Sequence, residues 1–161
     1  MNCDEILKKL KSIATTKHKD NIIRLRIPEQ ACIGVSTGSI RKLAKSLDKS
    51  NMLAYELGNT GYHEAKLLAI LLFDHNGFSL DEAEHLMKQV ISWDLCDHLC
   101  KNLIIKLPDY GSLIAKWCNS SGLYTKRAAF TLIAASVVSN KHINSDTLDN
   151  YLRLIFKYSC D

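Results

Sequence analysis

Trp93 and Asp97 are the two residues whose types and spacing best suit chemistry in this 161-residue chain. They are four positions apart, so in a helix both side chains project from one face. An aromatic ring beside a lone carboxylate can hold a sugar and stabilise a cation that forms on it. Cleavage of a glycosidic bond develops such a cation, an oxocarbenium-like sugar. The pair therefore suggests glycosidic-bond chemistry. On the opposite face of this helix we expect a buried stripe, formed by Leu95, Cys96, Leu99, Cys100, Leu103 and Ile104.

A structural interpretation of the same segment stays open. Trp93 can pack at the start of a helix, and Asp97 can form an ion pair with Lys101, one turn further on. Asp94, at the expected helix start, can cap the helix or complement its dipole. Residue types and spacing alone do not decide between this interpretation and the chemical one.

The same helix carries Cys96 and Cys100 on one face, with His98 between them. These three residues could be part of a metal site, or the cysteines could be small buried hydrophobes in a reducing compartment. Helix spacing supplies two ligands and nothing nearby completes the set, so we expect no metal. The six cysteines contain no Cys-x-x-Cys pair and lie at positions 3, 32, 96, 100, 118 and 160.

Helical periodicity recurs along the chain, and two prolines and seven glycines interrupt it little. We expect Ser36 or Thr37, Ser50 and Ser79 to begin helices as capping residues. Short connections between about nine helices require neighbouring helices to be antiparallel. The expected helical segments are 4–14, 37–47, 51–57, 63–73, one beginning at 80, 93–107, 109–118, 123–138 and 145–158.

A weak internal repeat favours a particular all-α architecture. Similar buried helices begin at Ala65, Cys96 and Ala128, which are 31 and 32 residues apart. A helix-pair repeat of this length is typical of an α-solenoid, whose stacked pairs bury one continuous core. An irregular helical bundle is the alternative. No linker or low-complexity segment is evident, so we expect a single domain over residues 1–161.

In a solenoid the inner helices line a concave surface. If the three similar helices are the inner ones, their polar residues line one groove. The candidate groove residues are His63, Glu64, Lys66, Trp93, Asp97, Lys101, Lys126 and Arg127.

The net charge of +4 comes entirely from the first half of the chain. Residues 1–80 contain 12 Lys and Arg against 8 Asp and Glu, whereas residues 81–161 contain 9 of each class. Such an excess suits contact with a polyanion, although a solvated helix face explains many basic clusters. No apolar run is long enough to span a membrane, and the start lacks the pattern of a signal peptide. We therefore expect a cytoplasmic protein.

Four segments, in order, resemble the AlkD-like DNA alkylation repair family. These are HEAT-like α-solenoid DNA glycosylases that remove alkylated purines. The resemblance implies a HEAT-like all-α fold and covers about residues 25 to 135. The matching segments are Gly34-Val35-Ser36 with Ile40 to Lys45, Thr60 to Ala69, Ser92 to Asp97, and Lys126 to Phe130.

The resemblance also implies roles for individual residues. Asp97 matches the catalytic aspartate that stabilises the sugar cation, and Trp93 matches the aromatic residue beside the deoxyribose. Arg127 matches an arginine that contacts the DNA backbone. The implied substrate is double-stranded DNA containing 3- or 7-alkylpurines. The enzyme would hydrolyse the N-glycosidic bond of these purines as a monomer, without metal or organic cofactor. Further candidates for phosphate contacts are Lys126, Lys101, Lys66 and Arg41.

The chain departs from the family pattern in two places. Family members usually continue with a helix pair whose Trp and Arg complete the DNA groove. The tryptophans of this chain are Trp93 and Trp117, and we expect Trp117 to be a core residue rather than a groove residue. Some members have an N-terminal tyrosine facing DNA, whereas residues 22–34 here contain no aromatic side chain. A non-catalytic DNA-binding solenoid and a protein-interaction scaffold therefore stay open as alternatives.

Overall fold

The structure, a computed structural model, describes residues 1–140 and 142–159, so Lys141, Cys160 and Asp161 lie outside the described residues. The described part of the chain is all helical, as predicted, and none of its helices is long and apolar enough to cross a membrane. The α-helices are α1 (Cys3–Ser12), α2 (Thr16–Arg24), α3 (Thr37–Ala44), α4 (Asn51–Gly58), α5 (His63–Leu72), α6 (Leu80–Met87), α7 (Trp93–Asn102), α8 (Tyr110–Trp117), α9 (Leu123–Ser139) and α10 (Ser145–Lys157). Short 3-10 helices cover Glu29–Ala31, His75–Gly77 and Ile104–Lys106.

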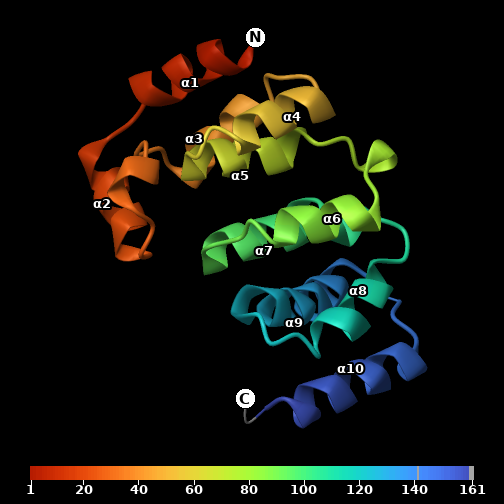
Figure 1. Cartoon of the computed structure of the whole chain (residues 1–161). Coiled ribbons are helices and arrows are strands. Elements are labelled where there is room, and N and C mark those ends of the chain that lie inside the picture. Colours follow the sequence, from red (N-terminus) through yellow and green to blue (C-terminus); the bar gives the residue numbers. More distant parts are fainter. Residues whose placement is uncertain (141, 160–161) are drawn as a thin grey trace.

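The helices form a stack whose two ends carry the two ends of the chain (Figure 1). Helices α3, α5, α7 and α9 form one row in which each packs against the next. Helices α4, α6 and α8 follow one another along a second row, with α4 packed on α5 and α8 on α9. Helix α10 lies beyond α8 and α9 at the end of the stack. This arrangement of helix pairs confirms the predicted α-solenoid.

Side-chain caps fix where several helices begin. Ser36, Ser50 and Ser79 each accept a hydrogen bond from the backbone N–H three residues further on, as predicted. Helix α2 was not predicted, because only two of its nine residues, Ile22 and Ile23, are apolar and only Ile22 is buried. Thr15 caps α2 by accepting a hydrogen bond from the N–H of His18.

The predicted core stripe of α7 is confirmed, since all six of its residues are buried. The helix is shorter than predicted: it ends at Asn102, and the chain continues as a 3-10 helix over Ile104–Lys106. Trp117 is 3% exposed and belongs to the core, also as predicted. Helix α7 packs between α5 and α9 in the row formed by α3, α5, α7 and α9.

The prediction that His63 and Glu64 line the groove is wrong, because both side chains are buried. The Glu64 carboxylate accepts hydrogen bonds from the backbone N–H groups of Ile33, Gly34 and Val35. Gly34 has a φ of +103°, and a Cβ there would lie 2.7 Å from the carbonyl oxygen of Thr15. Glu64 therefore stabilises the loop before α3, and the loop geometry explains the glycine.

Candidate functional site

Asp97 is the centre of a cluster of polar side chains between α7 and α9. Arg127 donates from Nε to Oδ1 of Asp97 at 2.9 Å and from Nη2 to Oδ2 at 3.2 Å. Thr131 donates from its hydroxyl to Oδ1 at 3.1 Å, and Lys101 donates from Nζ to Oδ2 at 3.4 Å. Both carboxylate oxygens are thus held in place, and the side chain keeps 19% of its surface exposed. Such a carboxylate is fixed in position yet accessible to a ligand.

These contacts keep Asp97 ionised. Burial on its own raises the pKa of Asp97, but the hydrogen bonds and the charge of Arg127 lower it more. The charge of Lys101 and the hydrogen bond from Thr131 act in the same direction, so the net result is a pKa below the ordinary value. At neutral pH Asp97 is a carboxylate able to stabilise a positive charge.

Arg127 also covers Trp93. Its guanidinium carbon lies 5.6 Å from the centroid of the Trp93 ring, within the range of a cation–π contact. Trp93 is the first residue of α7 and leaves 47% of its surface exposed, whereas the side chain of Arg127 leaves 42%. Arg127 therefore contacts both residues that the sequence suggested for glycosidic-bond chemistry, the ring of Trp93 and the carboxylate of Asp97.

The Asp97 cluster borders a hollow of about 700 Å³. Its walls come from α7, from residues 123–134 of α9 with the preceding turn, and from Tyr158 at the C-terminal end of α10. Lys101 and Lys126 supply positive charge, and apolar side chains supply part of the surface. The lining residues are Asp97, Lys101, Ser121, Gly122, Leu123, Lys126, Arg127, Phe130, Thr131, Ala134 and Tyr158.

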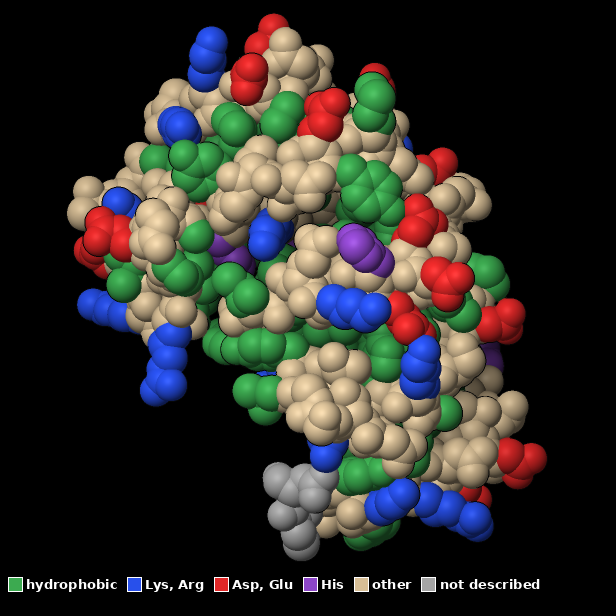
Figure 2. All heavy atoms as spheres, viewed as in Figure 1, with side chains coloured by type: hydrophobic (Ala, Val, Ile, Leu, Met, Phe, Trp, Pro, Cys, Tyr) green, Lys and Arg blue, Asp and Glu red, His purple; other side chains and the backbone are tan. Residues whose placement is uncertain are grey.

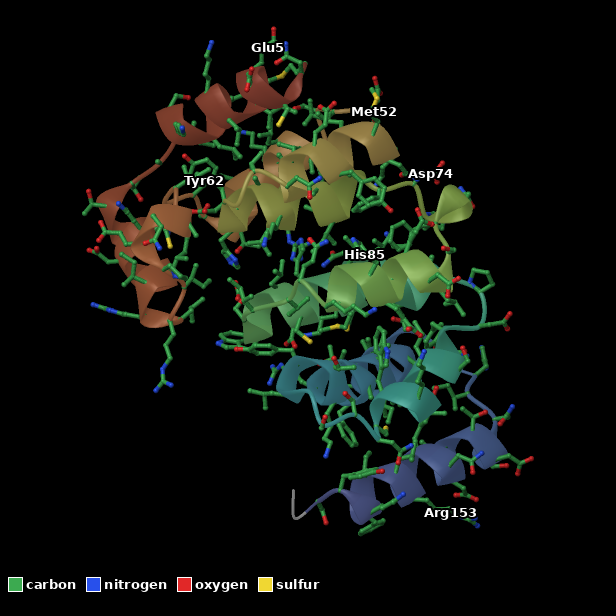
Figure 3. The ribbon with its side chains drawn as sticks, in the orientation of Figure 1. Glu5, Met52, Tyr62, Asp74, His85 and Arg153 are labelled. Atoms are coloured by element: carbon green, nitrogen blue, oxygen red, sulfur yellow. The ribbon has the colours of Figure 1, made fainter. Side chains whose placement is uncertain are left out.

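Two of the predicted phosphate-binding residues lie elsewhere. Arg41 is exposed on α3 and donates from Nη1 to Oδ1 of Asn102 at 3.2 Å, near the C-terminal end of α7. Lys66, on α5, lines a separate pocket with Tyr55 and His85. His85 is labelled on α6 in Figure 3. The structure therefore brings Lys101, Lys126 and Arg127 to the hollow around Asp97, and it does not bring Lys66 there.

Asp94 belongs to a different, largely buried polar contact. Its Oδ2 lies 2.7 Å from Nε2 of His63, the first residue of α5, and its Oδ1 accepts a hydrogen bond from the Ser92 hydroxyl. The helix is capped by Ser92 rather than by Asp94. Burial raises the pKa of Asp94, but the hydrogen bond and charge of His63, with Ser92, lower it below the ordinary value. Asp94 therefore joins α7 to α5.

Cys96, His98 and Cys100 of α7 do not form a cluster of metal-binding side chains. Within residues 1–140 and 142–159, no three His, Cys, Asp or Glu side chains are arranged to hold a metal ion. His98 Nε2 lies 3.1 Å from the carbonyl oxygen of Leu67, and burial lowers its pKa to about 4. The thiols of Cys96 and Cys100 point to the carbonyl oxygens of Tyr124 and Ala128 on α9.

Sequence reasoning did not identify Thr131 and Tyr158, two residues of the hollow whose side chains contact predicted site residues. Thr131 follows Arg127 by four positions on α9, so the shared helix face was a signal that it could reach Asp97. Tyr158 comes from α10, and its ring lies 5.1 Å from Nζ of Lys126 and packs edge-on against Phe130. No local pattern predicts that contact, because it depends on how α10 folds back onto α9.

Comparisons with known proteins agree with the helical fold described above. Residues 6–157 match the family model described as DNA alkylation repair enzyme. A solved structure of a protein from "a new family of proteins related to the HEAT-like repeat DNA glycosylases with affinity for branched DNA structures" superposes with a TM-score of 0.88. The match has 18% identity and covers 98% of this chain and 68% of the other, so it shows the fold alone. No curated protein matches the sequence. The match over nearly the whole chain shows that this protein belongs to the DNA alkylation repair enzyme family, with the HEAT-like fold of the AlkD-like glycosylases.

Proposed function

We propose that this protein is a DNA glycosylase that hydrolyses the N-glycosidic bond of 3- or 7-alkylpurines. The observation that carries the proposal is the ionised, partly exposed carboxylate of Asp97, held beside the Trp93 ring at the edge of a lysine-lined hollow. An N3- or N7-alkylated purine already carries a positive charge. It leaves with the electron pair of the broken bond as a neutral base, so the site needs no strong general acid.

Asp97 is the group suited to the sugar. As the bond between C1′ and the purine nitrogen breaks, positive charge develops on the deoxyribose, and a fixed carboxylate stabilises it. Water then adds to C1′ and releases its proton to solvent. The exposed face of Trp93, one helical turn before Asp97, can pack against the sugar and exclude water from one side.

Arg127 has to move for this chemistry, since it occupies both Asp97 and the face of Trp93. A DNA phosphate is a bidentate acceptor for arginine and competes directly with the carboxylate. An ion pair with an exposed arginine is worth only on the order of 1 kcal/mol, so several phosphate contacts outweigh it. We infer that DNA binding draws Arg127 to the backbone and frees Asp97 and Trp93 for the sugar.

The decisive experiment measures free methylated purine released from alkylated duplex DNA by excess protein at low salt. We expect release above the uncatalysed rate, and loss of that release in Asp97→Asn. The matched control is Asp81→Asn, which changes an exposed aspartate of α6 and should leave release unchanged. Absence of release by the unaltered protein would contradict the glycosylase proposal.

A second candidate is DNA binding without base release. It is favoured by the solved structure of similar fold, whose family is described as having affinity for branched DNA structures, and by the Arg127–Asp97 pair that occupies the carboxylate. This candidate predicts salt-sensitive binding that is tighter for a four-way junction than for a duplex, with no base released from either. Junction and duplex affinities, measured beside the release assay, separate the two candidates.

A further inference from the structure

The pocket that Lys66 lines, here called the Lys66 pocket, is a second cavity with a role that the glycosylase proposal does not supply. It lies between the α4–α5 pair and the α6–α7 pair and has a volume of about 100 Å³. Figure 2 shows histidine and basic side chains on this face of the molecule, where the two helix pairs meet. None of its lining residues also lines the hollow around Asp97, so the two cavities are separate.

Apolar side chains form the floor of the Lys66 pocket. Every buried residue of its lining is apolar, and these residues include Ala54, Ala69, Ile70, Phe73, Leu95 and Leu99. An apolar cavity of about 150 Å³ can hold a benzene molecule, so this floor has room for an apolar group of about four to six carbon atoms. The enclosed part of any ligand is therefore apolar.

Polar side chains form the rim of the pocket. Asn59 and His85 are exposed, and Lys66 and Gln89 are half-buried. The Nε2 atoms of His85 and Gln89 lie 3.1 Å apart, so these two side chains contact each other at the rim. An apolar floor below a few convergent polar groups is typical of a small-molecule site.

The formal charge of the lining at neutral pH comes from Lys66. Within the described part of the chain, no hydrogen bond or ion pair holds its ammonium group, and no Asp or Glu lines the pocket. The nearby carboxylate of Glu82 accepts a hydrogen bond from the Tyr55 hydroxyl at 2.8 Å and from the backbone N–H of Ser79 at 2.7 Å. A half-buried ammonium group without a carboxylate partner favours an anionic ligand.

We propose that the Lys66 pocket binds a small carboxylate, whose apolar body enters the cavity and whose carboxylate group pairs with Lys66. One lysine matches the single charge of a carboxylate, whereas a phosphate monoester carries a charge of about −1.5 to −2 at neutral pH. The proposal is independent of the glycosylase activity, because the pocket shares no residue with the Asp97 hollow.

Benzoate is the probe, because it joins one phenyl ring to one carboxylate. Titration of the full chain, followed by NMR, shows which backbone amides respond and gives the affinity. We expect the signals of the pocket residues to shift, and benzoate to bind at least about tenfold more tightly than benzyl alcohol or acetate. Each of these two compounds lacks one of the two required features. Signals that shift only around Asp97, or no shift up to about 10 mM benzoate, would overturn the proposal.

Lys66→Gln tests the charge. It keeps a polar side chain at the rim but removes the ammonium group, so we expect the affinity for benzoate to fall about tenfold and the preference over benzyl alcohol to disappear. Lys42→Gln, at an exposed lysine of α3 outside the pocket, is the matched control and should bind as the unaltered protein does. A Lys66→Gln variant that keeps the preference would contradict the proposed pairing.

Ala69→Leu tests the cavity, because the larger side chain occupies the floor. Leu86→Trp fills the same space from a half-buried position on α6 and serves as a second variant if Ala69→Leu does not fold. We expect either variant to lose benzoate binding while circular dichroism and thermal unfolding verify that it is folded. A folded variant that fills the cavity and still binds benzoate as tightly as the unaltered protein would overturn the proposal.

Discussion

Asp94 and Asp97 are two aspartates of α7, three residues apart, and both have a pKa held below the ordinary value. Their partners differ. Asp94 pairs with His63, which is 2% exposed and belongs to the neighbouring helix α5. Asp97 pairs with Arg127 and Lys101, whose side chains are 42% and 54% exposed.

The comparison shows that a lowered pKa does not by itself identify a functional carboxylate. The partner of Asp94 cannot be replaced without unpacking α5 from α7, so this pair stabilises the fold. The partners of Asp97 are exposed and can turn to a phosphate, so the carboxylate can change partners. The location of the partner, rather than the strength of the pairing, distinguishes the two aspartates.

Asp97→Asn tests the functional side of the comparison and has the largest expected effect. The amide keeps the shape of the carboxylate but removes the charge that stabilises the sugar cation. We expect base release to fall at least about 100-fold, with little change in the midpoint of thermal unfolding. Single-turnover release and calorimetry measure the two quantities. A variant that retains full release would exclude a catalytic role for Asp97.

Arg127→Ala tests whether the exposed partner also contacts DNA. We expect affinity for duplex DNA to fall about tenfold, and the slope of log affinity against log salt to fall by about one, because one phosphate contact is lost. Fluorescence anisotropy over a range of salt concentrations measures both. Lys88→Ala, at an exposed lysine outside the hollow, is the control. An unchanged salt slope in Arg127→Ala would show that Arg127 pairs with Asp97 alone.

Asp94→Asn tests the structural side. Removing the charge that pairs with His63 should lower the free energy of unfolding by about 1–3 kcal/mol, because a buried partner is left poorly satisfied. Base release per folded molecule should change little. Denaturant unfolding, followed by release at a temperature where the variant is folded, checks both statements. A large loss of release without loss of stability would reverse the assignment of the two aspartates.

Thr131→Val tests a positioning residue. It removes one hydrogen bond to Asp97 while keeping the size of the side chain, and we expect base release to fall about fivefold. Thr131→Ser retains the hydroxyl and should restore most of the release. If Thr131→Val and Thr131→Ser lose release equally, the effect comes from packing rather than from the hydrogen bond.

The smallest expected effect is that of pH on Asp97. Because its folded pKa lies below the ordinary value of 3.8, the carboxylate is charged above that pH and loses its charge only as the pH falls further. Base release, corrected for uncatalysed loss, should therefore stay level from about pH 8 to about pH 5 as far as Asp97 is concerned. In the protein without DNA, replacing Arg127 by Ala should raise the pKa of Asp97, because the hydrogen bonds and charge of Arg127 are then lost. A fall centred near neutral pH would show that a different group titrates.

Much of the fold could be predicted from the sequence, because strong periodicity and capping residues specify local structure. The stripe of α7 and the caps at Ser36, Ser50 and Ser79 are examples. Helix α2 could not, since it has few apolar residues and depends on a cap at Thr15. The burial of Glu64 could not be predicted either. Its carboxylate accepts hydrogen bonds from backbone N–H groups about 30 positions earlier in the chain, which no local pattern reveals.

The candidate site was predictable in part. Helical spacing placed Trp93 and Asp97 on one face, and the family resemblance added Arg127. The direct contact of Arg127 with both residues depends on how α9 packs against α7, which spacing within one helix does not describe. Lys66 was expected in the same groove, yet its helix turns it towards α6 and a separate pocket.

The most direct test of Asp97 as the stabiliser of a sugar cation compares two DNA ligands. One carries a cationic nitrogen sugar at the abasic position, and the other carries a neutral tetrahydrofuran in its place. If Asp97 stabilises the cation, the protein binds the cationic ligand at least about tenfold more tightly, and Asp97→Asn loses that preference while Asp94→Asn keeps it. Equal affinity of the unaltered protein for the two ligands, or an unchanged preference in Asp97→Asn, would contradict the catalytic assignment.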